Sequence, residues 1–132
     1  MNRTRVLAVL SLALYGFACY APAVRNMSEP SGPQPPISGL GTLIIGWIPP
    51  ATVPWSANLM ALGGWILFGR KRYSAARLMG VLAFLTALLT WVVLGFQSLL
   101  TGYYLWQASF LAFTACAHVA GAEWRKRSAM QP

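Results

Sequence analysis

Few side chains in this sequence have the chemistry to act as an acid, a base, a nucleophile or a metal ligand. The two acids are Glu29 and Glu123, the single histidine is His118, and the cysteines are Cys19 and Cys116. On a helix, His118 lies about one turn from Glu123, which makes the two a candidate acid–base pair. A buried proton relay needs further carboxylates or histidines along a path, and no other apolar segment contains one. We therefore predict that the protein is not an enzyme and has no catalytic residues.

The spacing of the cysteines and the histidine is equally uninformative about metals and cofactors. The sequence has no Cys-x-x-Cys pair and no second histidine, so the usual spacings assemble no metal or haem site. Cys19 lies late in the first apolar run and Cys116 in the last one, at depths that differ by more than about 10 Å. A disulfide needs Cα atoms within about 7 Å of each other. We expect no metal ligands and no cofactors, and we interpret both cysteines as packing residues.

Composition indicates a membrane environment. The chain has 132 residues, of which 57% are hydrophobic and only 9% charged, against about a quarter charged in soluble domains. The net charge of +8 does not indicate a nucleic-acid partner, because the basic residues stand in short clusters at the ends of apolar runs. Such clusters are typical of cytoplasmic membrane flanks. They are Arg3 and Arg5; Arg70, Lys71, Arg72 and Arg77; and Arg125, Lys126 and Arg127, with Arg25 apart.

Four apolar segments predict an all-α fold, a polytopic membrane protein with four transmembrane helices in a single domain, residues 1–132. A spanning helix needs about 20 mostly apolar residues, and the basic clusters place both termini in the cytoplasm. The predicted helices are 6–24, 56–69, 75–98 and 102–122, with an external loop 25–55, a cytoplasmic loop 70–74 and a cytoplasmic tail 123–132.

The first apolar segment has two interpretations. Arg3 and Arg5, the apolar run and Ala21-Pro22-Ala23 are arranged as in a secretory signal with an A-x-A cleavage site. The run continues to Val24, however, and the apolar region of a signal is normally only about 7–15 residues long. We favour a retained helix, and cleavage of residues 1–23 stays open.

The segment before the second predicted helix is unusual. Residues 25–36 form a polar, Pro-rich loop, and 37–55 is apolar but interrupted by glycines and prolines. A helix over 56–69 spans only about 21 Å, against a hydrocarbon core of about 30 Å. We therefore predict that 37–55 is a broken segment on the outer face, and its being re-entrant or interfacial stays open.

Small residues recur at helical spacing and predict close packing between helices. They are Ala108, Ala112, Cys116 and Ala120 on the last predicted helix, Gly63 and Gly64 on the second, and Gly80, Ala83, Ala87 and Thr90 on the third. Packing within the bundle is one interpretation of these rows. A surface for a partner helix or for a second copy of the chain, giving a homo-oligomer, is the other.

Polar and aromatic residues gather at the predicted outer level of the bundle. An interfacial aromatic belt, with the amides paired inside the bundle, is one interpretation. A recognition surface for a partner is the other, and we predict it for Trp47, Trp55, Asn58, Gln97 and Gln107.

Four short pieces of the sequence carry a resemblance. They are Cys19-Tyr20-Ala21-Pro22-Ala23, Gly46-Trp47, Trp55-Ser56-Ala57-Asn58 and Gly102-Tyr103-Tyr104-Leu105-Trp106. In this order they resemble a group of short, uncharacterised bacterial inner-membrane proteins. The overall layout is similar to that of membrane-bound immunity proteins. The resemblance implies a location in the bacterial inner (plasma) membrane and no activity.

The functional prediction follows from the lack of chemistry and from the outer surface. We expect a non-enzymatic protein that binds another membrane protein or a membrane-active toxin. In its most concrete form it is an immunity protein that neutralises a pore-forming toxin. A small transport or channel component, in which the broken segment binds the substrate, and an assembly factor for a membrane complex are the alternatives.

Overall fold

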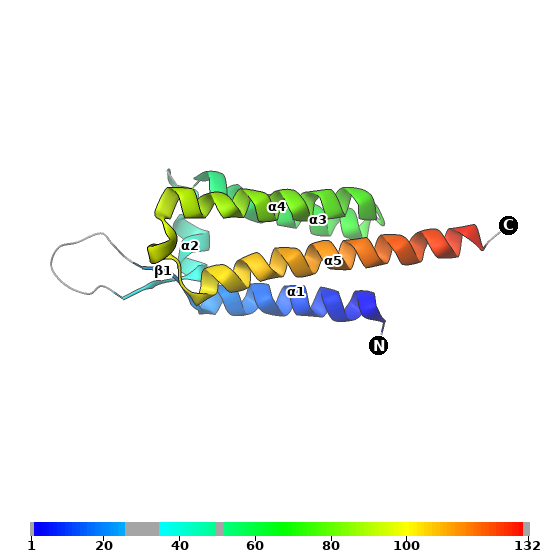
Figure 1. Ribbon diagram of the computed structural model, residues 1–132, viewed down its shortest axis with the longest axis horizontal. Helices are drawn as coiled ribbons and strands as arrows, with labels where there is room; N and C mark the ends of the chain where they lie inside the picture. Colours follow the sequence, from blue (N-terminus) through cyan, green and yellow to red (C-terminus); the bar gives the residue numbers. More distant parts are fainter. Residues whose placement is uncertain (1, 26–34, 50–51, 131–132) are drawn as a thin grey trace.

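Four long helices run side by side in the computed structural model, which describes residues 2–25, 35–49 and 52–130 (Figure 1). They are α1 (Arg3–Tyr20), α3 (Thr52–Gly69), α4 (Tyr73–Leu94) and α5 (Thr101–Ala129). The short elements all lie at one end of the bundle, and they are β1 (Pro22–Val24), β2 (Ile37–Ser38), α2 (Gly39–Ile45) and the 3-10 turn η1 (Phe96–Ser98).

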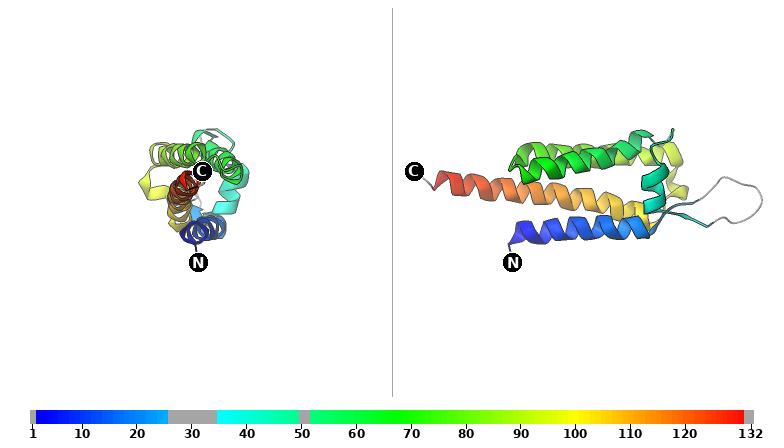
Figure 2. Two further views of the ribbon diagram at one scale, coloured as in Figure 1. Left: turned by 90° about the vertical axis from the view of Figure 1, so that its right-hand side faces the viewer. Right: turned by 180° about the vertical axis from the view of Figure 1, so that it is seen from behind.

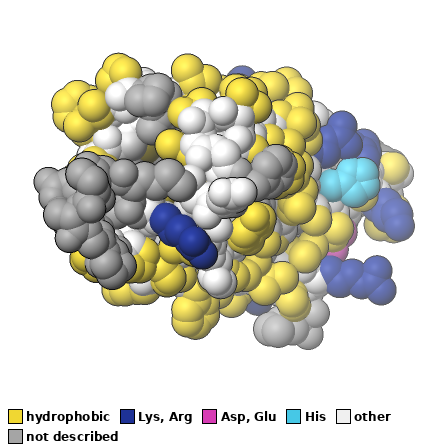
Figure 3. All heavy atoms as spheres, turned by 60° about the vertical axis from the view of Figure 1, so that its left-hand side comes forward, with side chains coloured by type: hydrophobic (Ala, Val, Ile, Leu, Met, Phe, Trp, Pro, Cys, Tyr) yellow, Lys and Arg dark blue, Asp and Glu magenta, His cyan; other side chains and the backbone are white. Residues whose placement is uncertain are grey.

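The bundle has two chemically different ends. We name the end with β1, β2, α2 and η1 the α2 end, and the opposite end, where α1 begins, α3 turns into α4 and α5 finishes, the basic end (Figures 1 and 2). Nine of the ten Lys and Arg residues belong to segments at the basic end, and Arg25, directly after β1, belongs to the α2 end. In Figure 3 most Lys and Arg side chains gather on one side, while apolar side chains cover the length of the bundle in this view.

The prediction of four transmembrane helices is wrong. Among the described residues, α4 is the one helix long and apolar enough to cross a membrane. The other long helices have the length but carry polar residues that lower their mean hydropathy. Arg3 and Arg5 are part of α1, Pro54 and Asn58 lie in α3, and the basic cluster after Glu123 continues α5.

The observed element boundaries differ from the predicted ones where local hydrogen bonding decides. The predicted helix 6–24 ends at Tyr20, because Pro22–Val24 leaves the helix to pair as a strand. The predicted helix 56–69 begins four residues earlier, at Thr52, and the predicted tail after 122 is helical to Ala129. The predicted helix 75–98 corresponds to α4 and η1, and Gly95, with φ 74°, separates them. Residues 26–34 of the predicted external loop lie outside the described residues.

The fold is helical, but the prediction of an all-α protein missed a small antiparallel pairing. β1 pairs with β2, with Pro22 opposite Ser38 and Val24 opposite Ile37. Alternating burial over so few residues gives no detectable period of two in the sequence. The described residues of the predicted broken segment 37–55 include a strand, a short helix and the first turn of α3.

Much of the core of the bundle is built from small side chains, with Phe110 and Phe113 as its largest members, while many large aliphatic side chains face outward. Ala57, Ala83 and Ala87 have no exposed surface, whereas Val92 is 83% exposed and Phe17 is 68% exposed. The buried residues of α4 are Ala76, Gly80, Ala83, Ala87 and Thr90, which is the face that the spacing of small residues predicts. Small residues on the contacting faces let the helix backbones approach closely.

The predicted packing residues differ in burial. Cys116 and Ala120 are buried, and Ala108 and Ala112 are half-buried. Gly64 faces Phe113, whose Cε1 would lie 2.7 Å from a Cβ at this position, but nothing lies within 4 Å of a Cβ at Gly63. The row on α5 contacts α1 through Cys116, whose thiol donates to the Thr4 carbonyl at 3.3 Å.

We predict that Ala117→Leu destabilises the bundle and that Ala115→Leu does not. Ala117 is 1% exposed and lies with Ala76 and Phe113 in the core, so a larger side chain costs about 1–3 kcal/mol through overpacking. Ala115, two residues earlier on α5, is exposed. Thermal unfolding of the purified variants measures the difference, and equal melting temperatures would contradict this packing.

Candidate functional site

The α2 end is held together by backbone hydrogen bonds on both edges of β1. One edge pairs with β2, and on the other the amide of Arg25 donates to the Ser98 carbonyl and the amide of Leu100 donates to the Ala23 carbonyl, both at 2.8 Å. The segment between α4 and α5 is thereby joined to the end of α1. This pairing fixes where α5 begins.

The short helix α2 is stabilised at both of its ends. The Ser38 hydroxyl accepts a hydrogen bond from the amide of Gly41 at 3.1 Å, a typical N-cap. At the other end, the indole of Trp55 on α3 donates to the Leu43 carbonyl at 2.8 Å. The same ring lies against Gly46, where a Cβ would approach its Cδ1 to 2.7 Å. A larger residue at position 46 would therefore separate α2 from α3.

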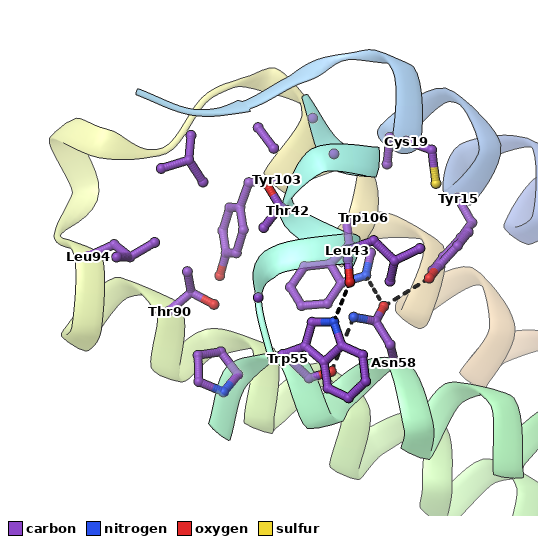
Figure 4. A pocket seen from close by; sticks show the side chains of 17 residues that line it. Tyr15, Cys19, Thr42, Leu43, Trp55, Asn58, Thr90, Leu94, Tyr103 and Trp106 are labelled. Atoms are coloured by element: carbon purple, nitrogen blue, oxygen red, sulfur yellow. Dashed lines mark hydrogen bonds between the residues drawn. The ribbon is translucent and has the colours of Figure 1, made fainter. Parts of the chain in front are cut away.

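Asn58 links three helices (Figure 4). Its side-chain carbonyl accepts two hydrogen bonds, from the Tyr15 hydroxyl on α1 and from the Trp106 indole on α5, both at 2.9 Å. Its amide group donates to the Trp55 carbonyl at 3.1 Å. Along most of their lengths, the described residues of α1 and α3 are not packed against each other, so Asn58 supplies the bridge between them.

A partly open cavity of about 80 Å³ lies around this bridge, beneath α2. We name it the α2 pocket. Its lining comes from all the long helices and from α2 and β1, and no charged side chain takes part. Most of the residues are apolar: Ala18, Cys19, Ala23, Val24, Gly39, Leu43, Gly46, Pro54, Leu94 and Gly102. The others carry a hydroxyl, an amide or an indole: Tyr15, Thr42, Trp55, Asn58, Thr90, Tyr103 and Trp106.

Two residues deep between α4 and α5 complete the polar part of the site. The Tyr103 hydroxyl donates to the Ala87 carbonyl at 2.9 Å and accepts from the Gln107 amide at 2.6 Å. Gln107 is buried, and its carbonyl oxygen has no hydrogen-bond partner among the described residues. The side chain of Thr90, which lines the pocket, forms a hydrogen bond with the Tyr103 hydroxyl.

No family model, no curated protein and no solved structure matches this chain.

The α2 pocket unites the four pieces on which the resemblance to bacterial inner-membrane proteins rests. Each piece contributes to the lining, through Cys19 and Ala23, Gly46, Trp55 and Asn58, and Gly102, Tyr103 and Trp106. A larger residue than glycine would not fit at position 102, because a Cβ there would lie 2.8 Å from the Ala21 carbonyl oxygen. The resemblance itself stays a prediction.

The residues predicted to bind a partner do not form one surface. Trp55 and Asn58 line the pocket, whereas Gln107 lies buried between α4 and α5. Gln97 is exposed on η1, and Trp47 is 60% exposed beyond the end of α2. The three amides therefore share an end of the bundle but not a site, since Asn58 lines the pocket, Gln107 is buried and Gln97 is exposed.

The sequence analysis missed several polar contributors to the pocket. Tyr15 stands in an apolar run and Thr90 in a row of small residues, and neither is among the predicted partner-binding residues. Trp106 belongs to a piece singled out by the resemblance, yet its bond to Asn58 spans 48 residues. Polar tips on otherwise apolar helix faces are the one signal that could have identified these residues.

The basic end holds His118 and Glu123 but does not bring them together as a catalytic pair. The Nδ1 atom of exposed His118 lies 3.1 Å from the Arg77 guanidinium. Because arginine only donates, the guanidinium is the donor in this contact. Glu123 accepts from the Thr4 hydroxyl at 3.1 Å and lies 3.6 Å from Arg127. No three His, Cys, Asp or Glu side chains within 2–25, 35–49 and 52–130 could hold a metal ion.

We predict that Asn58→Leu lowers the free energy of unfolding by about 1–2 kcal/mol, because Tyr15 and Trp106 both lose their acceptor. Ser56→Ala on the same helix is the control, since the Ser56 hydroxyl bonds only to the Val53 carbonyl of its own turn. In the Asn58→Leu background, Tyr15→Phe should cost little more. Additive effects in this double-mutant cycle would show that the Tyr15–Asn58 bond does not stabilise the protein.

Proposed function

We propose that this protein resides in a membrane, with α4 crossing it and the apolar outer faces of the other helices in contact with lipid. The observation that supports this is the distribution of side chains, with many alanines inside and many Leu, Val and Ile side chains outside. Contiguous apolar surface on this scale is unusual for a protein surrounded by water. The finer proposal is the bacterial inner (plasma) membrane.

The orientation follows from the gathering of basic residues. The clusters at the start of α1, between α3 and α4 and at the end of α5 are far apart in the sequence but lie at the same end of the bundle (Figure 1). Because Lys and Arg are retained on the cytoplasmic side, we propose that α4 crosses with its start, beside the basic end, toward the cytoplasm and its other end, at the α2 end, toward the outside.

Cysteine labelling tests the orientation. In a background with Cys19 and Cys116 replaced by alanine, we expect Ile48→Cys at the α2 end to react with a membrane-impermeant maleimide in spheroplasts. Ser128→Cys at the basic end should react only after permeabilisation. Both positions are exposed, so access to the reagent decides the result. Labelling of Ser128→Cys in intact spheroplasts would refute the proposed orientation.

We propose further that the protein acts by binding a membrane-inserted partner and not by catalysis. The observation that carries this proposal is an exposed apolar surface on α2 and the turn after it, which we name the α2 ledge: Leu40, Ile44, Ile45, Trp47 and Ile48. Exposed tryptophans surrounded by aliphatic side chains are typical centres of protein interfaces.

The ledge is supported by bonds that fix it before any partner arrives. The Ser38 cap and the Trp55 indole hold the two ends of α2, and the Thr52 hydroxyl donates to the Trp47 carbonyl at 2.8 Å. A surface held in this way loses little conformational entropy on binding. Its position at the proposed outer end is where a protein that enters the membrane from outside would meet it.

The most concrete form of this function is immunity to a pore-forming toxin. Such a protein needs a place in the bilayer and an outward recognition surface, and no reacting group. Beside Arg25 and the Cys19 thiol, the functional groups described at the α2 end are amides, hydroxyls and indoles, which can bind a partner and form no nucleophile–base pair among the described residues. The alternatives of a transport component and of an assembly factor gain no further support from the described contacts.

Photo-crosslinking in cells tests the proposed partner binding. With a photoreactive amino acid at position Trp47, we expect a specific crosslinked protein, and with the same group at Leu85, which is 52% exposed on α4, only lipid. Trp47→Ala should lower retention of that protein at least about tenfold, as for a central interface residue, while Leu85→Ala should not.

The identity of the crosslinked protein decides between the broad and the narrow form of the proposal. A pore-forming toxin, together with loss of protection in Trp47→Ala cells, would support the immunity function. Any other membrane protein would support partner binding and contradict immunity. Equal crosslinking from both positions, or from neither, would contradict recognition by the α2 ledge.

A further inference from the structure

The basic end has a hollow of its own, between the start of α1 and the last turns of α5. We name it the basic hollow, and its lining includes Arg3, His118, Val119, Ala122, Glu123 and Lys126. Arg3 and Lys126 bring two positive charges to it from different helices, and both side chains are exposed. Arg77 on α4 adds a third charge nearby, since its guanidinium is the donor toward His118 at 3.1 Å. The basic hollow therefore attracts a negatively charged group.

The one carboxylate in the lining is already engaged. Glu123 accepts a hydrogen bond from the Thr4 hydroxyl at 3.1 Å and lies 3.6 Å from the Arg127 guanidinium. It is the one acid among the described residues. Because Arg127 offsets the charge of Glu123, the charges of Arg3 and Lys126 are left without a described counterion. An anion of one or two charges would supply it.

An apolar surface continues from the basic hollow toward the α2 end. The helices α1 and α5 lie side by side there (Figure 1). On α1, Val6 and Leu10 follow Arg3 by one and two turns on the same face and are 39% and 46% exposed. On α5, Leu111 stands two turns before His118 on the same face and is 51% exposed. We name these three exposed residues, Val6, Leu10 and Leu111, the apolar strip.

We propose that the basic hollow binds the phosphate group of an anionic glycerophospholipid whose acyl chains lie along the apolar strip. The proposal rests on the proposed membrane residence, because the basic end then meets the cytoplasmic leaflet, where anionic lipids lie. Arg3 and Lys126 can donate charge-assisted hydrogen bonds to the phosphate oxygens. A water-soluble phosphate would satisfy these charges but leave the apolar strip uncovered. A lipid has a counterpart for both features in one molecule.

Comparison of two lipids with the same chains tests the charge of the ligand. Dioleoyl phosphatidylglycerol, which is anionic, and dioleoyl phosphatidylcholine, which has no net charge, are added to the full chain purified in a neutral detergent. Lipid retention is then measured by native mass spectrometry. We expect the parent to prefer phosphatidylglycerol about threefold to tenfold, the range for two exposed ion pairs. Equal retention of the two lipids by the parent would overturn the proposal.

Three variants that each remove one positive charge locate the binding. Arg3→Gln and Lys126→Gln should each lower the preference for phosphatidylglycerol about twofold or more, and the double variant should abolish it. Arg70→Gln removes the same charge at the same end of the bundle, but Arg70 does not line the basic hollow, so this control should match the parent. An equal loss in all three single variants, or a loss in none, would contradict the assignment to the basic hollow.

A lipid and a soluble phosphate are distinguished through the apolar strip. Leu111→Asn should lower the retention of both lipids severalfold, whereas Leu62→Asn, at a 60% exposed position of α3, should match the parent. Glycerol 3-phosphate in millimolar excess should not displace phosphatidylglycerol, because it lacks the chains that cover the strip. Displacement by glycerol 3-phosphate, or unchanged retention by Leu111→Asn, would show that the basic hollow takes a soluble phosphate and would overturn the lipid assignment.

Extraction of membranes with alkaline carbonate separates this proposal from the membrane residence on which it rests. We expect the chain to stay in the membrane fraction. If it stays there and the purified protein shows no preference for phosphatidylglycerol, the lipid site alone is wrong. If the chain leaves the membrane fraction, membrane residence is wrong and the lipid site is refuted with it.

Discussion

The hydrogen bonds of Asn58 are the interaction on which the α2 end depends. One amide oxygen accepts from Tyr15 on α1 and from Trp106 on α5, while the amide nitrogen stays bonded to the backbone of its own helix α3. Elsewhere α1 and α3 are not packed along their lengths, since α5 contacts α1 on one side and α4 on another. A polar bridge across this separation holds the helices together and leaves space beside it. The α2 pocket and the support for α2 both follow from that geometry.

The two ends of the bundle differ in how exposed their side-chain contacts are. At the basic end the side-chain contacts are mostly exposed, such as Glu123 with Arg127 and Lys71 over the ring of Trp124 at 5.1 Å, and contacts of this kind contribute little to stability. At the α2 end the bonds are partly buried and join segments far apart in the chain. These contacts agree with the two proposals, that the basic end sets the orientation in the membrane and that the α2 end recognises a partner.

The small-residue core explains how an apolar exterior is compatible with an ordered fold. Alanines and glycines let the helix backbones approach closely, so dispersion and a few interhelical hydrogen bonds replace the burial of large side chains. The large aliphatic residues are then free to face outward, and that surface is what motivates the proposed membrane location. Because many of the other lining residues are small, the aromatic residues Tyr15, Trp55, Tyr103 and Trp106 are the main bulky groups around the pocket.

The sequence by itself determined the helical character, the buried face of α4 and the segregation of charge, because these depend on residues close together in the chain. It overestimated the number of helices apolar enough to span a membrane, since long apolar runs were judged without the polar residues that the helices also include. It also placed Asn58, Gln97 and Gln107 on one surface from their depth alone. Only the tertiary structure decided which way each amide projects and that Tyr15, Asn58 and Trp106 meet. Rotation of a helix about its axis is fixed by its neighbours, and a pattern within one segment does not contain that information.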